Sequence, residues 1–365
     1  MNNFLKVILV GLLLSMVCSG AYHIPSVGAK KYDTDFKARS VEDIKILALI
    51  DHGFGDNYFT IKNQLEDWGC NVTTAGVATV VQSCPNKDPN PVTSDILIAE
   101  VDQAVLAEFD CIFIPAGGHW NTLAYNMEAL DLIATAYEEG LAIATLCIGS
   151  MVLANAHNIV DGVKVTNYHL SSTNMEAAGG ILTNARVVTD QHIITGGSGA
   201  MRGTNAPIYQ ICIAIMKEVL GISYVLNTTL EPSSGSIETN FTINVETTSD
   251  FSEVFTTGFS TEISTVTAYV YLENENVTPI KTVELTDKDQ DNIYSGNFTG
   301  LEAGKYYVDV EVKNHGEGLE VLRNAGSFSI VAAVPGYEFP ISIICLALVS
   351  LIFIKDRRSK KKFKK

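Results

Sequence analysis

Basic residues are scarce over most of this sequence. The chain of 365 residues has 25 Lys and Arg against 41 Asp and Glu, a formal charge of −16. Eight of the basic residues and one acid lie in the last eleven positions, so residues 1–354 have a formal charge of −23. A surface of this sign repels phosphate backbones and anionic lipids. We therefore expect no nucleic-acid partner.

The sequence also lacks tandem repeats and low-complexity tracts, and its His and Cys residues show no zinc-type spacing. We expect neither a resident metal nor a cofactor. Asp287, Asp289 and Asp291 alternate as loop carboxylates do in calcium sites, but the glycine and distal glutamate of an EF-hand are absent. Calcium binding and an acidic hairpin turn both remain open, and the pattern favours the turn.

Cysteine is infrequent, with seven in the chain, and two of these lie in the apolar terminal segments. Cys70 and Cys84 flank a predicted strand and loop and can pair in an oxidising exterior. Cys111 and Cys212 occur in apolar runs, which favours buried thiols. Cys147 has no obvious partner.

The two ends of the chain predict export and anchoring. Residues 1–21 have the layout of a secretory signal peptide, and a polar linker follows at 22–43. Residues 337–354 are predicted to be a single transmembrane helix, followed by a basic cytoplasmic tail at 355–365. We expect a cell-membrane protein whose bulk is extracellular. The C-terminus also resembles the sorting signals of archaeal surface proteins, in which the tail is cleaved and replaced by a lipid.

Residues 44–221 alternate between apolar runs of strand length and helical patterns. Strands are predicted at 44–50, 110–115 and 141–145, and helices at 127–139 and 206–220. Buried strands that alternate with helices indicate an α/β domain with a parallel sheet covered on both faces.

The periodicity changes to two after residue 221. In residues 306–313 (YYVDVEVK), apolar and polar side chains alternate, as expected of strands with one wet face. Several such segments predict a small all-β, immunoglobulin-like sandwich at 229–331.

The stretch ATLCIGS at 144–150 places Cys147 between a predicted strand and a predicted helix. Such a turn exposes its side chain at the carboxyl edge of the sheet, where the helix amides lower the pKa of a thiol. Gly149 suits the tight turn. A nucleophile and a small buried structural cysteine are both consistent with this pattern.

Four segments carry a resemblance to a known family. They are DHGFGDNYF (51–59), FIPAGGHWNTL (113–123), ATLCIGSMVLANA (144–156) and KVTNYH (164–169). Their order and spacing resemble the ThiJ/PfpI superfamily, also called the DJ-one/PfpI family. The resemblance implies a flavodoxin-like three-layer sandwich related to class I glutamine amidotransferases. Its members include proteases, chaperones, glyoxalases and proposed deglycases, are often dimeric, and share a reactive cysteine that corresponds to Cys147.

Two positions depart from the family pattern. Tyr58 stands where many members have a glutamate that hydrogen-bonds the cysteine, and Ile148 stands where protease-like members have a histidine. His119 and His169 follow predicted strands that end near the same edge, so either is a candidate general base. The backbone amides of Gly118 and Ile148 are candidate oxyanion donors.

The sequence therefore supports two hypotheses. The first is a cysteine-dependent activity on a small carbonyl compound or peptide, with Cys147 as nucleophile. The second is a catalytically impaired binding or scaffolding protein of the cell surface, because both usual partners of the cysteine are missing. A homodimer is consistent with either hypothesis.

Overall fold

The computed structural model describes residues 40–84, 91–197, 207–251, 261–273, 278–316 and 318–332. The expected signal peptide (1–21), transmembrane segment (337–354) and basic tail (355–365) lie outside these ranges, as does most of the linker. No helix within the described ranges is long and apolar enough to cross a membrane.

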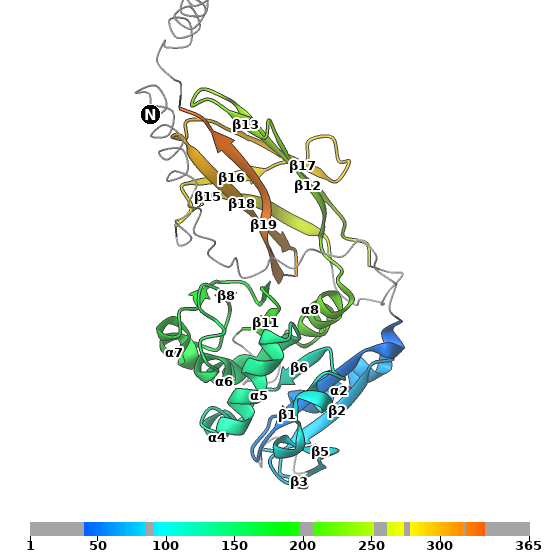
Figure 1. The fold of residues 1–365 in the computed structure, drawn as a ribbon. Helices are drawn as coiled ribbons and strands as arrows, with labels where there is room; N and C mark the ends of the chain where they lie inside the picture. Colours follow the sequence, from blue (N-terminus) through cyan, green and yellow to red (C-terminus); the bar gives the residue numbers. More distant parts are fainter. Residues whose placement is uncertain are drawn as a thin grey trace, which may run out of the picture. The chain divides into compact units, whose positions relative to one another are not determined.

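The first region of the chain alternates strands and helices (Figure 1). Its strands are β1 (Lys45–Ile50), β2 (Asn71–Gly76), β3 (Val80–Val81), β4 (Val92–Thr93), β5 (Ile96–Leu97), β6 (Cys111–Ile114), β7 (Ala142–Leu146), β8 (Lys164–Val165), β9 (Ile181–Leu182), β10 (Val187–Asp190) and β11 (Ile193–Gly196). Its helices are α2 (Asn57–Asp67), α3 (Gln103–Leu106), α4 (Trp120–Leu123), α5 (Met127–Glu138), α6 (Ser150–Asn155), α7 (Ser172–Ala177) and α8 (Ile208–Leu220). Short 3₁₀ turns are η1 (Val41–Asp43), η2 (Ile98–Glu100), η3 (Cys147–Gly149) and η4 (His169–Ser171).

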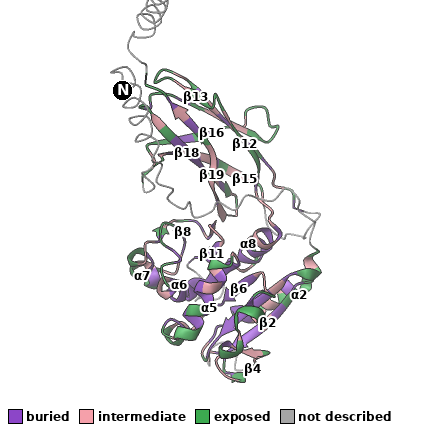
Figure 2. Ribbon diagram, viewed as in Figure 1, coloured by how far each residue is buried: buried purple, intermediate pink, exposed green. Residues whose placement is uncertain are grey.

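Strands β5, β2, β1, β6, β7 and β11 are neighbours in that order, and each pair is parallel. Because successive side chains of a strand point to opposite faces, Ile46 and Ala48 pack with residues of α2 and α8, whereas Leu47 and Leu49 pack with residues of α5, α6 and α7. Figure 2 shows the central strand β6 in the colour of buried residues. The predicted α/β architecture with a parallel sheet between helical layers is therefore confirmed.

One strand of this sheet runs against the others. Strand β10 pairs with β11 in antiparallel fashion, through a two-residue turn at Gln191 and His192. Both turn residues have positive φ, 51° and 65°, which is the conformation that tight hairpins require.

The second region is entirely β in its described residues. Its strands are β12 (Val225–Glu231), β13 (Ser234–Gly235), β14 (Phe241–Thr247), β15 (Ile263–Leu272), β16 (Lys281–Leu285), β17 (Ile293–Phe298), β18 (Gly304–Asn314) and β19 (Gly318–Ile330). Strands β12, β14 and β17 form one sheet, and β16, β15, β18 and β19 lie in another. Apolar side chains of both sheets, including Phe241, Val266 and Val308, belong to one core. The expected β-rich C-terminal region is thus present.

The two regions share one sheet. Strand β19 pairs in parallel with β10, so Val187, Val188 and Thr189 stand opposite residues 318–320. The parallel sheet of the first region therefore continues into the C-terminal region as a single sheet of twelve described strands. This pairing joins segments about 130 residues apart, and nothing in the local sequence predicts it.

The disulfide that Cys70 and Cys84 could form is not present in the structure. Neither residue is in a disulfide, and the other three cysteines of the described residues form none either. Cys70 is buried, and its Sγ lies 3.3 Å from the Sδ of Met216 on α8. Burial raises the pKa of the Cys70 thiol to about 12, which disfavours the thiolate near neutral pH.

Candidate functional site

Cys147 occupies a sharp turn between a strand and a helix. Strand β7 ends at Leu146, and α6 begins at Ser150, with the 3₁₀ turn η3 between them. Cys147 has φ of 55°, a left-handed conformation that is uncommon for a residue with a Cβ. Strained backbone of this kind gathers at functional sites. The turn geometry expected at ATLCIGS is therefore present.

The turn is packed tightly against the end of strand β6. A Cβ added at Gly149 would lie 3.1 Å from the carbonyl oxygens of Ile114 and Pro115. This is closer than an ordinary van der Waals contact, so only glycine fits without movement. The close approach brings the loop after β6, which carries Gly118 and His119, beside the turn of Cys147.

Cys147 is fully buried. Its exposed fraction is 0%, and it belongs to the same core cluster as Leu146, Ile148 and Met151. Reagents reach a thiol in such a position only if they are small or if a neighbouring loop moves. This burial favours a small substrate over a peptide.

Both ring nitrogens of His119 contact backbone groups. Its exposed fraction is 0%, its Nδ1 accepts a hydrogen bond from the backbone N–H of Asp51 at 3.3 Å, and its Nε2 lies 2.8 Å from the Pro115 carbonyl oxygen. The ring is therefore the neutral tautomer with the proton on Nε2, and both nitrogens are used. Burial is the main cause that lowers the pKa of His119 to about 4. Through these contacts the ring ties two loops together, and a role of His119 as general base stays a prediction.

Tyr58 does not replace the missing glutamate. Its hydroxyl is hydrogen-bonded to Thr74 Oγ1 at 2.7 Å, inside the core beside strand β2. Strand β2 lies three strands away from β7 in the sheet, about 14 Å at the usual strand spacing. Burial is also the main cause that raises the pKa of Tyr58. The phenol therefore contributes to packing and does not reach the cysteine.

His169 lies in η4, in a loop that is hydrogen-bonded to the cysteine turn. Ser150 Oγ donates to the Cys147 carbonyl oxygen at 2.8 Å and is 2.7 Å from Ser171 Oγ. The imidazole of His169 is exposed and packs against the ring of Tyr168, with centroids 4.1 Å apart. Of the two candidate bases, His169 is exposed and His119 is buried.

The candidate oxyanion donors come from two adjacent loops. Ile148 directly follows Cys147 in η3 and is buried, whereas Gly118 is exposed in the loop after β6. That loop turns at Gly117, where φ is 141° and an added Cβ would lie 2.4 Å from the Gly55 nitrogen. The segment therefore depends on glycine at this position.

Sequence reasoning missed two groups that build the site. Asn57 is buried, and its Oδ1 accepts a hydrogen bond from the backbone N–H of Ala116 at 3.0 Å. This bond joins the start of α2 to the loop after β6. The buried pair of Ser150 and Ser171 joins η4 to the cysteine turn. No local signal distinguishes these residues from ordinary polar positions, because their partners are distant in sequence.

The acidic run near residue 290 forms a turn. The Asp287 carboxylate accepts the backbone N–H groups of Asp291 and Asn292 at 3.2 and 3.0 Å. Asp291 Oδ1 accepts the N–H of Ile293 at 3.0 Å. Two of the three carboxylates therefore cap backbone groups between β16 and β17. Within the described ranges, no group of three or more His, Cys, Asp or Glu side chains is placed to hold a metal ion.

Residues 44–203 match the family model of the DJ-1/PfpI family. DJ-1 protein homolog F of Arabidopsis thaliana is 27% identical over 97 residues, which make up 27% of this chain and 24% of that protein. The matched part of the chain thus spans about a quarter of the length of this curated relative.

Solved structures of the same kind are also similar. A ThiJ/PfpI domain protein from Brachyspira murdochii matches at 18% identity and a TM-score of 0.43, over 50% of this chain and 98% of that one. DJ-1beta of Drosophila melanogaster matches at 23% identity and a TM-score of 0.41, over 49% and 91%. A two-domain protein of Anabaena variabilis with DJ-1/ThiJ/PfpI-like and ferritin-like domains matches at 23% identity and 0.43, over 49% and 48%.

Proposed function

We propose, from the match of residues 44–203 to the DJ-1/PfpI family model, that the protein uses Cys147 as a nucleophile towards a small carbonyl compound. The single observation that carries the proposal is the left-handed turn of Cys147, with φ of 55°, between β7 and α6. Such a conformation persists only where the surroundings enforce it, and the tight contact of Gly149 with the loop after β6 supplies that restraint.

The proposed reaction begins with addition of the thiolate to the carbonyl carbon. The Cys147 Sγ–carbon bond forms, the electron pair of the C=O double bond moves to oxygen, and the product is a thiohemiacetal anion. The thiol proton passes to the ring of His169, through water where the gap requires it, and returns to the oxyanion. The amides of Ile148 and Gly118 stabilise the negative charge until then.

Thiol chemistry tests this proposal directly. The alkylation rate of each cysteine is measured against pH by peptide mapping, in the wild type and in Cys147→Ser. We expect Cys147 to react near neutral pH. The other buried thiols serve as internal controls, because burial holds the pKa of Cys70 near 12 and raises that of Cys212 still further. A pH midpoint for Cys147 at or above about 8.5, the value of a free thiol, would end the proposal.

A glyoxalase assay and a peptidase assay on the same two proteins identify the reaction. The burial of Cys147 favours the small substrate, so we expect turnover of a dicarbonyl compound and none of a peptide. Activity in wild type that persists in Cys147→Ser would assign it to another group.

The second candidate is a binding or scaffolding protein of the cell surface. It is favoured by the engagement of His119 with Asp51 and Pro115 and by the distance of Tyr58 from the cysteine turn. An unreactive Cys147 together with no turnover in either assay is the result expected of this alternative.

Membrane attachment and homodimer formation belong to the same proposal. The sequence pattern at 337–365 supports an anchor with a basic tail, and the pattern at 1–21 supports export. Mass spectrometry of the membrane-bound protein separates the two routes, because an intact C-terminus excludes cleavage and lipid attachment. Sedimentation of the detergent-solubilised protein reports the oligomeric state.

A further inference from the structure

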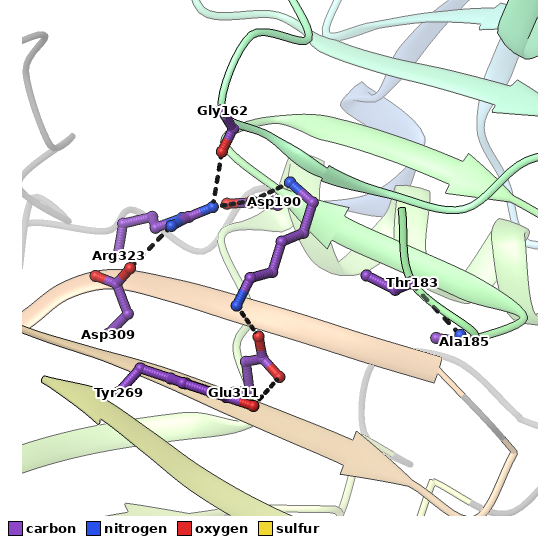
Figure 3. Close-up of polar contacts among 9 residues, drawn as sticks. Gly162, Thr183, Ala185, Asp190, Tyr269, Asp309, Glu311 and Arg323 are labelled. Atoms are coloured by element: carbon purple, nitrogen blue, oxygen red, sulfur yellow. Dashed lines mark hydrogen bonds and ion pairs between the residues drawn. The ribbon is translucent and has the colours of Figure 1, made fainter. Parts of the chain in front are cut away.

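Two charged side chains of the C-terminal region hold a segment that leads to the cysteine turn (Figure 3). Arg323 on β19 donates from Nη2 to the Gly162 carbonyl oxygen at 3.1 Å. Its Nε and Nη2 also donate to the two carboxylate oxygens of Asp190, at 2.9 and 2.5 Å. Its Nη1 donates to Asp309 at 2.9 Å. One guanidinium thus connects β19 and β18 to the residues before β8.

The next contact along the same segment is made by Lys164. Its Nζ forms an ion pair with Glu311 of β18 and lies 4.4 Å from the ring centroid of Tyr269 on β15. Its backbone N–H donates to Asp190 Oδ2 at 2.7 Å. The Lys164 and Glu311 side chains are 11% and 14% exposed. Water therefore competes little for this pair.

Strand β8 continues directly into the loop beside the cysteine. The Thr166 N–H donates to Thr195 Oγ1 at 2.9 Å, which fixes the start of the loop on β11. At its far end, Ser171 Oγ lies 2.7 Å from Ser150 Oγ. Each hydroxyl also donates to a backbone carbonyl oxygen, Ser150 to that of Cys147 and Ser171 to that of Tyr168, and either hydroxyl can be the donor in the contact between them. The loop that carries His169 is therefore held at both ends.

We propose that Arg323 and Glu311 are positioning residues for the cysteine site. They hold residues 162–164, and thereby keep the loop 167–172 against the turn of Cys147. The proposal rests on the proposed role of Cys147 as a nucleophile. Its physical basis is that a reactive site needs its groups held within a fraction of an ångström by surrounding contacts. The C-terminal region supplies these contacts through the side chains of Arg323 on β19 and Glu311 on β18, and not through backbone hydrogen bonds of the sheet.

The test compares variants of the full chain at one junction. Glu311→Gln removes the negative charge that pairs with Lys164. Arg323→Lys keeps the positive charge but removes the guanidinium group, whose Nη2 donates to the Gly162 carbonyl oxygen. Glu320→Gln is the matched control. Glu320 pairs with Lys217 of α8 at the same junction and contacts Ser223 and Tyr224, with no hydrogen bond to β8.

Hydrogen exchange of the peptide spanning 163–172 is the first readout. We expect Glu311→Gln and Arg323→Lys to speed its exchange about tenfold, the effect of losing one charge-assisted hydrogen bond. The control is expected to leave this peptide unchanged. Equal exchange in all four proteins, or the same increase in the control, would overturn the proposal. Because this readout does not depend on thiol chemistry, it decides whether the junction holds the loop even if Cys147 proves unreactive.

The pH profile of Cys147 alkylation is the second readout. We expect its midpoint to move towards that of a free thiol in Glu311→Gln and Arg323→Lys, and to stay in place in Glu320→Gln. A merely structural junction would destabilise all three variants without moving the midpoint. A reactive wild-type Cys147 whose midpoint is the same in every variant would refute the positioning role while leaving the proposed function intact.

Discussion

The cysteine turn and the junction between the two regions use charged side chains in opposite ways. Around Cys147 the candidate partners are occupied elsewhere or exposed, since His119 binds two backbone groups and Tyr58 binds Thr74. At the junction, Arg323 is paired with two carboxylates, Asp190 and Asp309, that are almost fully buried. The comparison teaches that the ion pairs of Arg323 with Asp190 and Asp309 join the two regions, whereas the cysteine turn is distinguished by its backbone geometry.

The largest expected effect is the loss of the junction cation. Arg323→Met leaves Asp190 and Asp309 buried without their partner, and breaking a buried pair in this way costs about 3–5 kcal/mol. Equilibrium denaturation of the full chain measures the change. Lys305→Met is the control, because its pair with Glu273 is exposed at 73% and 57%, and such a pair contributes less than about 1 kcal/mol. Equal losses in the two variants would contradict the contrast between junction and surface.

The next effect is a pH dependence that originates beside the cysteine turn. Burial lowers the pKa of His119 from 6.5 to about 4, so the unfolded chain binds the proton first as pH falls. Stability is therefore complete above pH 6.5 and is lost between pH 6.5 and about 4, by about 3 kcal/mol for this group.

Denaturation of the wild type and His119→Gln across this range measures the contribution. The variant is expected to have a flatter profile, because its amide can make both hydrogen bonds without titrating. His315→Gln, at an exposed position, is expected to follow the wild type. A wild-type slope that His119→Gln retains would assign the pH dependence to other groups.

A smaller effect is expected from filling the tight turn. Gly149→Ala places a Cβ 3.1 Å from the carbonyl oxygens of Ile114 and Pro115, an overpacking expected to cost about 1–3 kcal/mol. The turn must move away from β6, so alkylation of Cys147 is expected to slow at neutral pH. In the control Gly326→Ala, the nearest atom is Leu230 Cβ at an ordinary 3.8 Å. An unchanged alkylation rate in Gly149→Ala would show that reactivity does not depend on the shape of the turn.

The smallest effect separates packing from chemistry at the family's glutamate position. Tyr58→Phe removes the hydrogen bond to Thr74 and is expected to cost about 1 kcal/mol. The pH profile of Cys147 alkylation is expected to stay unchanged, because the phenol lies beside β2. Thr74→Val is the matched variant, since it removes the other partner of the same bond. A shift of the alkylation profile in Tyr58→Phe but not in Thr74→Val would show that the Tyr58 hydroxyl influences Cys147.

Local patterns in the sequence predicted the elements near the cysteine well. The apolar runs at 44–50, 110–115 and 141–145 form β1, β6 and β7, because continuous burial on both faces of a sheet leaves a direct hydrophobic signal. The hairpin turn between β10 and β11 leaves a weaker signal in the sequence. It uses Gln191 and His192 in place of the asparagine and glycine that usually mark such turns.

What the sequence determined by itself is therefore the alternation of strands and helices, the β-rich second region, and the strand, turn and helix at Cys147. These depend on periodicity and on residues close together in the chain. Only the tertiary structure decided that β19 extends the sheet at β10, that Arg323 joins Asp190 and Asp309, and that both ring nitrogens of His119 are occupied. The reason is physical, because a hydrogen bond or ion pair requires two groups within about 3 Å, and sequence patterns do not specify which distant groups will meet.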